Sequence, residues 1–455
     1  MSNLNENRLN EHSSNLEKNE AKNFWHESIR YITFGFMFTL VTFNFLWLQY
    51  ILPSLGVLFL YIGFRKLRNE NKAFYGAYVF SVINLIYNIL SLIYVNTPLN
   101  VNSKNSSIMA FFLTIFQIIF LILFRNGIRN IINRENIELK KDPILGLIIW
   151  RILIIVIAIT ELGEIWIIFI PTLIYYFYSL KSINKLKYEL ENISNISSKE
   201  NGEINKKTFA IFYGVVCLFT VGICCLFSNH TNLESTEIVP VNEFATRNML
   251  IDNGTPIEIV RDIVDEDISL LKNIINIESF SEDLTFEDYS KTTLKATSIF
   301  IELEDNEMYG IEYFDFGEDG PYWQDGFAIN NTYHLELING SLLYESEGVD
   351  YSARIPRLSG ELITSTDIFG QEIQERKITG AINYPRNTKN QRGYVFYKIN
   401  IPEGTLVGNN IVNYMHYSHP FRVPYTEIEK QNLSFTSKLK QHGGNFTTKL
   451  GKSNY

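Results

Sequence analysis

Side chains with varied chemistry gather in one short segment in the second half of the chain. Residues 315–326 read Asp-Phe-Gly-Glu-Asp-Gly-Pro-Tyr-Trp-Gln-Asp-Gly. Carboxylate oxygens are the ligands that hard cations such as calcium prefer, and aromatic rings can stack on an apolar or sugar surface. The segment therefore predicts a ligand-binding loop, formed by Asp315, Glu318, Asp319, Tyr322, Trp323 and Asp325.

A structural interpretation of this loop stays open, because glycine-rich acidic segments with a tucked Trp also connect strands. The EF-hand pattern is excluded, since Gly317 and Gly326 stand at loop positions three and twelve, where it requires oxygen ligands. The sequence contains no HExxH, CxxC, GxSxG or GxGxxG motif. We therefore predict no catalytic residue, no metal centre and no cofactor, and we favour a protein that is not an enzyme.

A second candidate lies in the apolar first half of the chain. Arg151 is a charge near the middle of a predicted membrane span, and Glu161 and Glu164 follow it within a short loop. Charged residues inside a membrane are costly, so they mark functional sites unless the side chain reaches the lipid surface. Both interpretations of Arg151 stay open.

His416 and His419 form a third candidate, either for zinc or for a secreted-type hydrolase. Residues three apart in a strand point to opposite faces, so this pair can share a metal ion only if a loop brings both side chains together. The hydrolase ranks behind the other two interpretations.

The elements that must position these side chains follow from the apolar runs. About 20 apolar residues cross the hydrocarbon core of a membrane, and they must be helical because lipid offers backbone groups no hydrogen-bond partner. Gln49, Tyr50 and Pro53 predict a turn within the longest run. We predict seven spans, at residues 31–48, 51–67, 73–94, 107–124, 143–160, 164–180 and 209–227.

The distribution of Lys and Arg predicts the orientation of these spans, because cytoplasmic loops carry an excess of basic residues. The segments after the second, fourth and sixth spans are basic, whereas the alternate loops hold almost no Lys or Arg. We therefore predict a disordered cytoplasmic tail at 1–28, three helical hairpins at 29–180, a basic cytoplasmic linker at 181–207 and a seventh span at 208–227. The seventh span would take the remaining residues outside the cell membrane.

The two halves of the chain differ in charge. Residues 1–227 carry 21 basic and 15 acidic side chains, whereas residues 228–455 carry 19 basic and 34 acidic side chains, a net charge of −15. Nucleic acid binds proteins through its phosphates, so the acidic half disfavours it as a partner. The three cysteines lie between residues 217 and 225, so no disulfide stabilises the acidic half.

For residues 228–292 we predict an extracytoplasmic linker and a helical stem. Gly254 can end one helix in a left-handed cap, and Thr255 and Pro256 can start the next as its N-cap and first residue. Asp265 can cap a third helix, whose apolar residues recur at helical spacing as far as Ile275. The acidic side chains at 262–267 suit a first helical turn, and a cation site is the alternative.

From 293 to 430 the apolar pattern becomes that of strands, which predicts a sandwich-like or barrel domain. Asn339-Gly340 predicts a type I′ hairpin that would pair Leu337 with Leu342, Leu335 with Tyr344 and His334 with Glu345. Strands are expected at 298–303, 309–314, 333–338, 341–346, 351–355, 373–378, 393–399 and 411–416. The polar segment 431–455 predicts a flexible tail.

Several short motifs resemble those of a known group of proteins. In the apolar half these motifs are Ile51-Leu52-Pro53-Ser54-Leu55-Gly56, Tyr61-Ile62-Gly63-Phe64-Arg65-Lys66-Leu67, and Asp142-Pro143-Ile144-Leu145 leading into Trp150-Arg151. They are similar to segments of uncharacterised multi-pass membrane proteins of low-GC Gram-positive bacteria. In the acidic half, Asn253-Gly254-Thr255-Pro256 and Arg392-Gly393-Tyr394-Val395 resemble the extracytoplasmic part of clostridial members. The resemblance is scattered over most of the chain and implies an envelope location, with no activity and no functional residues.

The sequence as a whole predicts an α-helical membrane bundle of about seven spans and a C-terminal α+β, mainly β, water-soluble domain. The favoured function is that of a multi-pass cell-membrane protein that displays the acidic domain to bind an extracytoplasmic ligand or protein, with the lipid bilayer as its other partner. The alternative is a transporter or membrane-embedded enzyme that uses Arg151 with Glu161 and Glu164.

Overall fold

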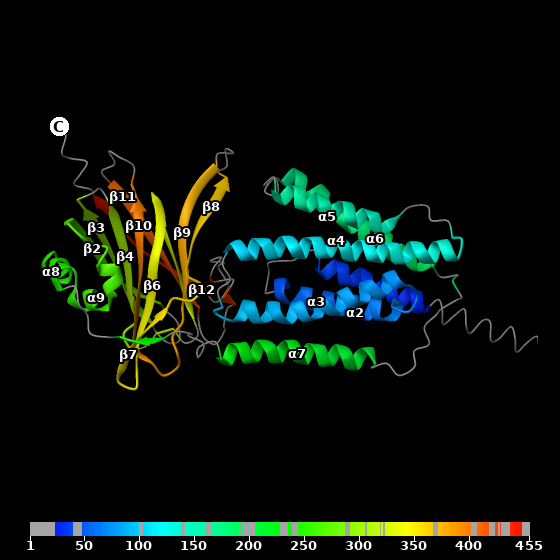
Figure 1. Ribbon diagram of the computed structural model, residues 1–455, viewed down its shortest axis with the longest axis horizontal. Coiled ribbons are helices and arrows are strands. Elements are labelled where there is room, and N and C mark those ends of the chain that lie inside the picture. Colours follow the sequence, from blue (N-terminus) through cyan, green and yellow to red (C-terminus); the bar gives the residue numbers. More distant parts are fainter. Residues whose placement is uncertain are drawn as a thin grey trace, which may run out of the picture. The chain divides into compact units, whose positions relative to one another are not determined.

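The computed structural model divides the chain into two compact units, which are described separately (Figure 1). The first unit comprises residues 1–92 and 101–220, and the second comprises 93–100 and 221–455. The residues that the structure describes are 23–39, 48–99, 103–137, 142–159, 166–190, 193, 205–227, 235–238, 244–286, 292–304, 307–318, 320–321, 324–366, 372–401, 407–417, 424–425, 428 and 437–447.

Apolar helices build the first unit. A helix over residues 23–39 is followed by α2 (Leu48–Leu67), α3 (Lys72–Asn96), α4 (Ser103–Arg134), α5 (Pro143–Ile159), α6 (Trp166–Glu189) and α7 (Lys206–Phe227). Within the described residues, four of these helices contain segments that are long and apolar enough to cross a membrane: Tyr50–Leu67, Lys72–Asn96, Thr114–Arg134 and Lys206–Leu226. The α5 helix is apolar but shorter. The count of seven spans and their orientation remain predictions.

Aromatic rings form the core of this unit. Phe36 of the first helix, Phe64 of α2, and Phe120 and Phe124 of α4 contact one another with ring centroids 5.0 to 6.0 Å apart. Glycine lets the first helix and α2 approach closely, because a Cβ atom added to Gly63 would lie 2.5 Å from a side-chain carbon of the first helix.

Two predicted boundaries of the helical region are wrong. The tail predicted at 1–28 is too long, since the first helix already covers 23–28 and buries Trp25 completely. The linker predicted to begin at 181 starts too early, because α6 continues to Glu189 and buries Ile183 and Leu186 against the aromatic core.

The turn predicted at Gln49, Tyr50 and Pro53 is also wrong, because these residues lie inside α2. Proline near the start of a helix removes one backbone hydrogen bond but keeps a helical φ angle. The hydroxyl of Ser54 donates to the carbonyl oxygen of Tyr50 one turn earlier, at 3.0 Å.

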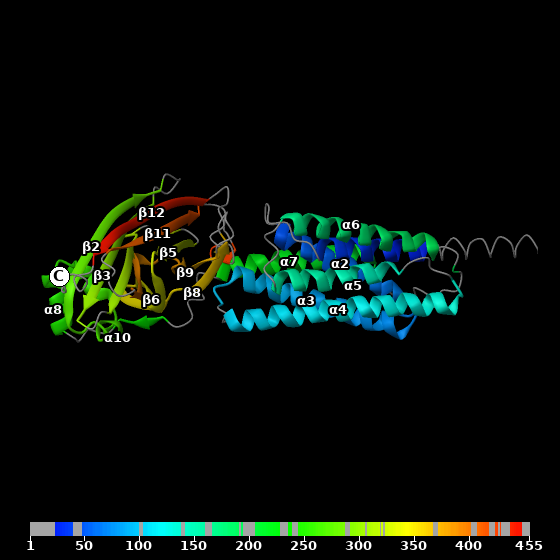
Figure 2. The same cartoon turned by 90° about the horizontal axis from the view of Figure 1, so that it is seen from above.

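Two antiparallel sheets build the second unit (Figure 2). The strands are β1 (Thr236–Glu237), β2 (Ile274–Thr285), β3 (Thr293–Leu303), β4 (Met308–Asp315), β5 (Asp325–Asn331), β6 (His334–Ser346), β7 (Val349–Arg354), β8 (Ser359–Thr366), β9 (Glu372–Ile382), β10 (Lys389–Asn400), β11 (Val407–Tyr417) and β12 (Ser437–Thr447). The seven-stranded sheet has the order β1-β7-β6-β10-β4-β3-β2, and the five-stranded sheet has the order β12-β11-β5-β9-β8. One apolar core lies between them and includes Phe300 and Phe314 from the first sheet and Phe327 and Ile378 from the second. The prediction of a mainly β domain in the C-terminal half is thereby confirmed, and its sheets are antiparallel.

Three short helices cover the other face of the seven-stranded sheet: α8 (Phe244–Asp252), α9 (Ile257–Asp262) and α10 (Asp265–Ile268). The cap at Gly254 is confirmed, since φ is +95° there and the following N–H of Thr255 donates to the carbonyl oxygen of Leu250 at 3.0 Å. Thr255 is not the N-cap of α9, because Pro256 holds that position.

The predicted third helix of the stem is too long. The α10 helix starts at Asp265 itself and ends at Ile268, and the chain from Ile274 onwards forms β2. The apolar residues at 274–277 pack against the sheet beside β3, and pairing along the whole strand offers the backbone more hydrogen bonds than a further helical turn.

The hairpin predicted at Asn339-Gly340 is wrong. The β6 strand runs straight through both residues and pairs with β10, with a register shift opposite Phe396 and Tyr397. The turn lies instead at Glu347 and Gly348, whose φ angles are +52° and +80°. His334 therefore pairs with Asn400 rather than Glu345, with its Nδ1 2.9 Å from the Asn400 amide nitrogen, and the predicted Leu337–Leu342 and Leu335–Tyr344 pairs do not form either.

The flexible tail predicted at 431–455 is wrong for its middle part. The β12 strand pairs with β11 along its entire length, and it turns His442 and Phe446 into the domain, where both are buried. The polar composition of this segment led to the wrong prediction, because only alternate residues of an edge strand need to be apolar.

Candidate functional site

The predicted acidic loop is only partly described, since Asp319, Tyr322 and Trp323 lie outside the described residues. Asp315 accepts a hydrogen bond from the N–H of Gly317 at 2.7 Å, and Glu318 is exposed. Asp325 is buried and accepts from the N–H of Tyr417 at 3.1 Å. Asp315 and Asp325 thus have structural partners, and the described residues contain no group of three His, Cys, Asp or Glu side chains suited to a metal ion.

His416 belongs to the same structural contact. Its Nδ1 lies 2.8 Å from the Oδ2 of Asp325, both side chains are buried, and the ring packs 4.9 Å from that of Phe286. His419 lies outside the described residues, so its role in a zinc site remains a prediction.

Arg151 lies on α5 and is half-buried. Its Nε atom is buried and has no hydrogen-bond partner among the described residues. Glu161 and Glu164 lie outside the described residues, so their pairing with Arg151 remains a prediction.

Three acidic residues of the predicted cluster at 262–267 have partners within the domain. Asp262 forms a double ion pair with Arg392, and Asp265 lies 2.7 Å from a guanidinium nitrogen of Arg247. Asp267 accepts hydrogen bonds from the hydroxyl of Tyr394 at 2.7 Å and from the amide of Asn339 at 3.1 Å. These contacts fix the helices on the sheet and give the acids structural roles.

Glu312 is a buried carboxylate that was not predicted as a site from the sequence. Glu312 on β4 lies between the two sheets, where its oxygens accept hydrogen bonds from the hydroxyls of Ser298 at 2.5 Å and Tyr414 at 2.7 Å. Burial raises the pKa of this carboxyl, and attraction to His442 lowers it in part. Strand alternation was the available signal, because Glu312 has the same parity as the core residue Phe314.

The outer face of the five-stranded sheet is exposed along β11 and β12. Exposed and buried residues alternate from Val407 to Val412 of β11, as expected for a sheet with one covered face. Further along the same face, Met415 and Tyr417 are buried with Tyr425 and Ile428. The outward side chains are uncharged amides, hydroxyls and aliphatics: Val407, Asn409, Ile411, Asn413, Leu439, Gln441, Asn445 and Thr447. We call this surface the open face.

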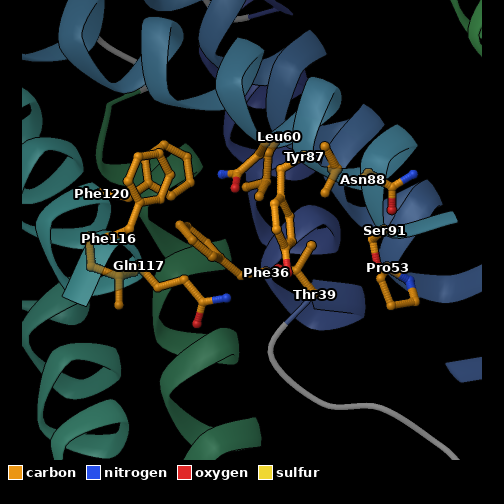
Figure 3. Close-up of a pocket in the computed structure, with 13 residues that line it drawn as sticks. Phe36, Thr39, Pro53, Leu60, Tyr87, Asn88, Ser91, Phe116, Gln117 and Phe120 are labelled. Atoms are coloured by element: carbon orange, nitrogen blue, oxygen red, sulfur yellow. The ribbon is translucent and has the colours of Figure 1, made fainter. Parts of the chain in front are cut away.

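The helical unit contains a partly open cavity of about 150 Å³ between the first helix, α2, α3 and α4. In Figure 3, Phe116, Phe120 and Gln117 lie on one side, Asn88, Ser91 and Pro53 lie on the other, and Tyr87, Phe36 and Thr39 lie between them. Asn84, Asn88 and Ser91 recur at helical spacing in the middle of an apolar helix, so they line one face of α3.

Polar contacts hold one wall of this cavity in place. The amide nitrogen of Asn88 donates to the hydroxyls of Ser54 on α2 at 3.0 Å and Tyr213 on α7 at 2.9 Å. Hydrogen bonds between helices compensate the cost of polar groups in an apolar environment. This site was not predicted from the sequence, although three polar residues at helical spacing in an apolar run were its signal.

Comparisons with known proteins leave the family open. No protein-family model and no curated protein sequence match the chain. The solved structures that match include a collagen-binding domain from a Staphylococcus aureus adhesin, 10% identical over 30% of this chain and 86% of that chain, with a TM-score of 0.18. A S. aureus collagen adhesin is 7% identical over 38% of this chain and 80% of that chain, with a TM-score of 0.17. These TM-scores are too low to carry an argument about fold or ligand.

Proposed function

We propose that the chain is a multi-pass protein of the cell membrane that displays its acidic β-rich domain in the extracytoplasmic space to bind a protein partner without catalysis. The observation that carries this proposal is the separation of the chain into two units. The candidate membrane spans lie mostly in the helical unit, whereas the acidic half forms a sandwich with its own core.

We assign the binding surface to the open face. The seven-stranded sheet is covered by α8, α9 and α10, whereas the residues that define the open face remain accessible in the first half of β11 and along β12. Amides next to aliphatic side chains suit a protein interface, which combines hydrogen bonds with apolar contact. The net charge of −15 favours a neutral or basic partner through electrostatic complementarity.

A photo-crosslinking amino acid placed at single positions of the full-length protein tests this assignment in intact cells. With the crosslinker at Gln441 on the open face, we expect a discrete adduct of higher mass. With the crosslinker at Asp283 on β2, which is also exposed, we expect no such adduct. Equal crosslinking at both positions, or none at either, would contradict the proposal.

Arg151 motivates the alternative function, a transporter or membrane-embedded enzyme. Its buried Nε without a partner among the described residues is the favouring observation, because unpaired charge in a membrane is costly. An Arg151→Leu variant that inserts normally but abolishes the cellular phenotype of the protein would support this alternative. Unchanged function of this variant would contradict the alternative, because Arg151 would then not be required.

A further inference from the structure

The side chains that line the cavity of the helical unit take no part in the proposed binding at the open face. The cavity walls contain aromatic rings, aliphatic side chains, amides and hydroxyls, and among the described residues that line it none is Asp, Glu, Lys, Arg or His. Burying an ion without a partner of opposite charge is strongly unfavourable. A molecule that enters this cavity must therefore be neutral.

The volume of the cavity and the aromatic rings in its walls restrict the size and kind of ligand further. Phe36, Phe116 and Phe120 present aromatic rings to the cavity, and aromatic pairs favour stacked or edge-to-face packing. An apolar cavity of roughly 150 Å³ accommodates one benzene-sized ring, whereas drug-sized ligands need about 300 Å³ or more. The cavity therefore suits a single small ring.

One polar atom of the wall requires a hydrogen-bond donor. The Oε1 of Gln117 is buried and has no partner among the described residues. A buried acceptor without a donor is unfavourable, so a ligand that donates to it gains affinity. Asn88 is less available, because its amide already bonds to Ser54 and Tyr213.

We propose that this cavity binds a small neutral aromatic molecule with one hydrogen-bond donor, the chemical class of phenol and its simple derivatives. The ring packs between Phe36, Phe116 and Phe120, and the donor bonds to the Oε1 of Gln117. The site is independent of the partner at the open face.

Phenol and toluene are a matched pair of probes, because they differ only in a hydroxyl against a methyl group. Binding is measured from the ligand-dependent rise in the unfolding temperature of the purified full-length protein, which converts to an affinity. Gln117→Leu removes the acceptor and keeps an apolar side chain. We expect it to weaken phenol binding roughly tenfold and to leave toluene binding nearly unchanged.

Two kinds of variant serve as controls for the effect of Gln117→Leu on phenol and toluene binding. Asn130→Leu removes an exposed amide from the same helix and should leave both affinities unchanged. Ser91→Phe fills the cavity and should abolish both, and Val57→Leu is a milder filling variant should Ser91→Phe fail to fold.

Two results would overturn the proposal. The first is that phenol and toluene stabilise the wild-type protein no more than a filled variant, which would mean that the cavity holds only water. The second is that Gln117→Leu weakens both compounds equally or neither of them.

Discussion

A carboxylate between two sheets is costly to ionise, and Glu312 holds this position. Burial raises the pKa of Glu312 above that in the unfolded chain, so the folded domain binds this proton more tightly. The contribution of this group to stability is therefore greatest below the unfolded pKa of about 4.3 and falls as the pH rises towards the folded pKa.

Glu312→Gln removes the titration and keeps both hydrogen bonds, because the amide oxygen can accept from Tyr414 and the amide nitrogen can donate to Ser298. We expect the variant to gain free energy of unfolding relative to the wild type as the pH rises above about 4.3, by about 1.4 kcal/mol per unit of pKa difference. Denaturant unfolding between pH 4 and 8 measures this gain, with Glu318→Gln as the exposed control. A difference that does not change with pH would contradict the expectation.

The ion pair between Asp262 and Arg392 joins α9 to β10. Arg392 donates from Nε at 2.6 Å and from Nη2 at 3.0 Å, and the Tyr313 hydroxyl donates to the same carboxylate at 2.6 Å. Burial lowers the pKa of Arg392, but the Asp262 carboxylate raises it by more, so the guanidinium stays charged.

Asp262→Asn keeps the shape but leaves this partly buried guanidinium without its nearest counter-charge. We expect a loss of about 2 kcal/mol in the free energy of unfolding, in the range for hydrogen bonds to charged groups. The midpoint of urea unfolding at pH 7 measures the loss. Asp283→Asn, an exposed acid on β2, should change stability by less than about 0.5 kcal/mol, and equal effects of both substitutions would refute the role of the pair.

Among the elements, β12 contributes to the β-rich domain although its polar composition predicted a flexible tail. It covers the edge of β11, and its Phe446 ring packs 4.6 Å from that of Phe300 in the opposite sheet. Deletion of residues 437–455 should destabilise the domain by more than about 3 kcal/mol, because a buried Phe is lost, and should promote aggregation through the uncovered edge. Thermal unfolding and size-exclusion chromatography test this expectation.

The shorter deletion of residues 448–455 is the matched control, because it keeps β12. It should leave the unfolding temperature almost unchanged. Should both deletions have the same effect, β12 would not stabilise the domain.

The elements that the sequence predicted well are those whose pattern is local. Apolar runs predicted the helices of the first unit, and strand alternation predicted β3, β4, β7, β9, β10 and β11 within a few residues. Gly254 was predictable because a left-handed cap depends on one residue type.

The wrong predictions concern local structure that depends on contacts with residues far away in the sequence. Asn339-Gly340 suits a two-residue turn, but β10 pairs through it and Asp267 accepts a hydrogen bond from the Asn339 amide, so β6 stays extended. The cavity and the buried Glu312 depend on contacts between separate elements, which spacing along one element does not reveal. Ligand binding by the acidic loop stays a prediction, but the buried pairing of Asp325 with His416, 91 residues away, could not be predicted because it leaves no trace in the local sequence.

At the scale of the whole molecule, the chain combines an apolar helical unit with an acidic β-rich unit. The basic loops between predicted spans are the basis for orienting the helices, and the span count decides on which side of the membrane residues 228–455 lie. Binding at the open face by an external partner requires that this side is the outside.

The central claim is therefore tested most directly by the location of a single cysteine. In a background with Cys217, Cys224 and Cys225 changed to Ala, Glu258→Cys places a thiol on the exposed surface of α9, and Lys185→Cys places one near the end of α6. Intact cells are treated with a membrane-impermeant maleimide. We predict labelling of the Glu258→Cys variant in intact cells and of the Lys185→Cys variant only after lysis. Labelling of the Glu258→Cys variant only after lysis would contradict the account, because the acidic domain would then lie in the cytoplasm.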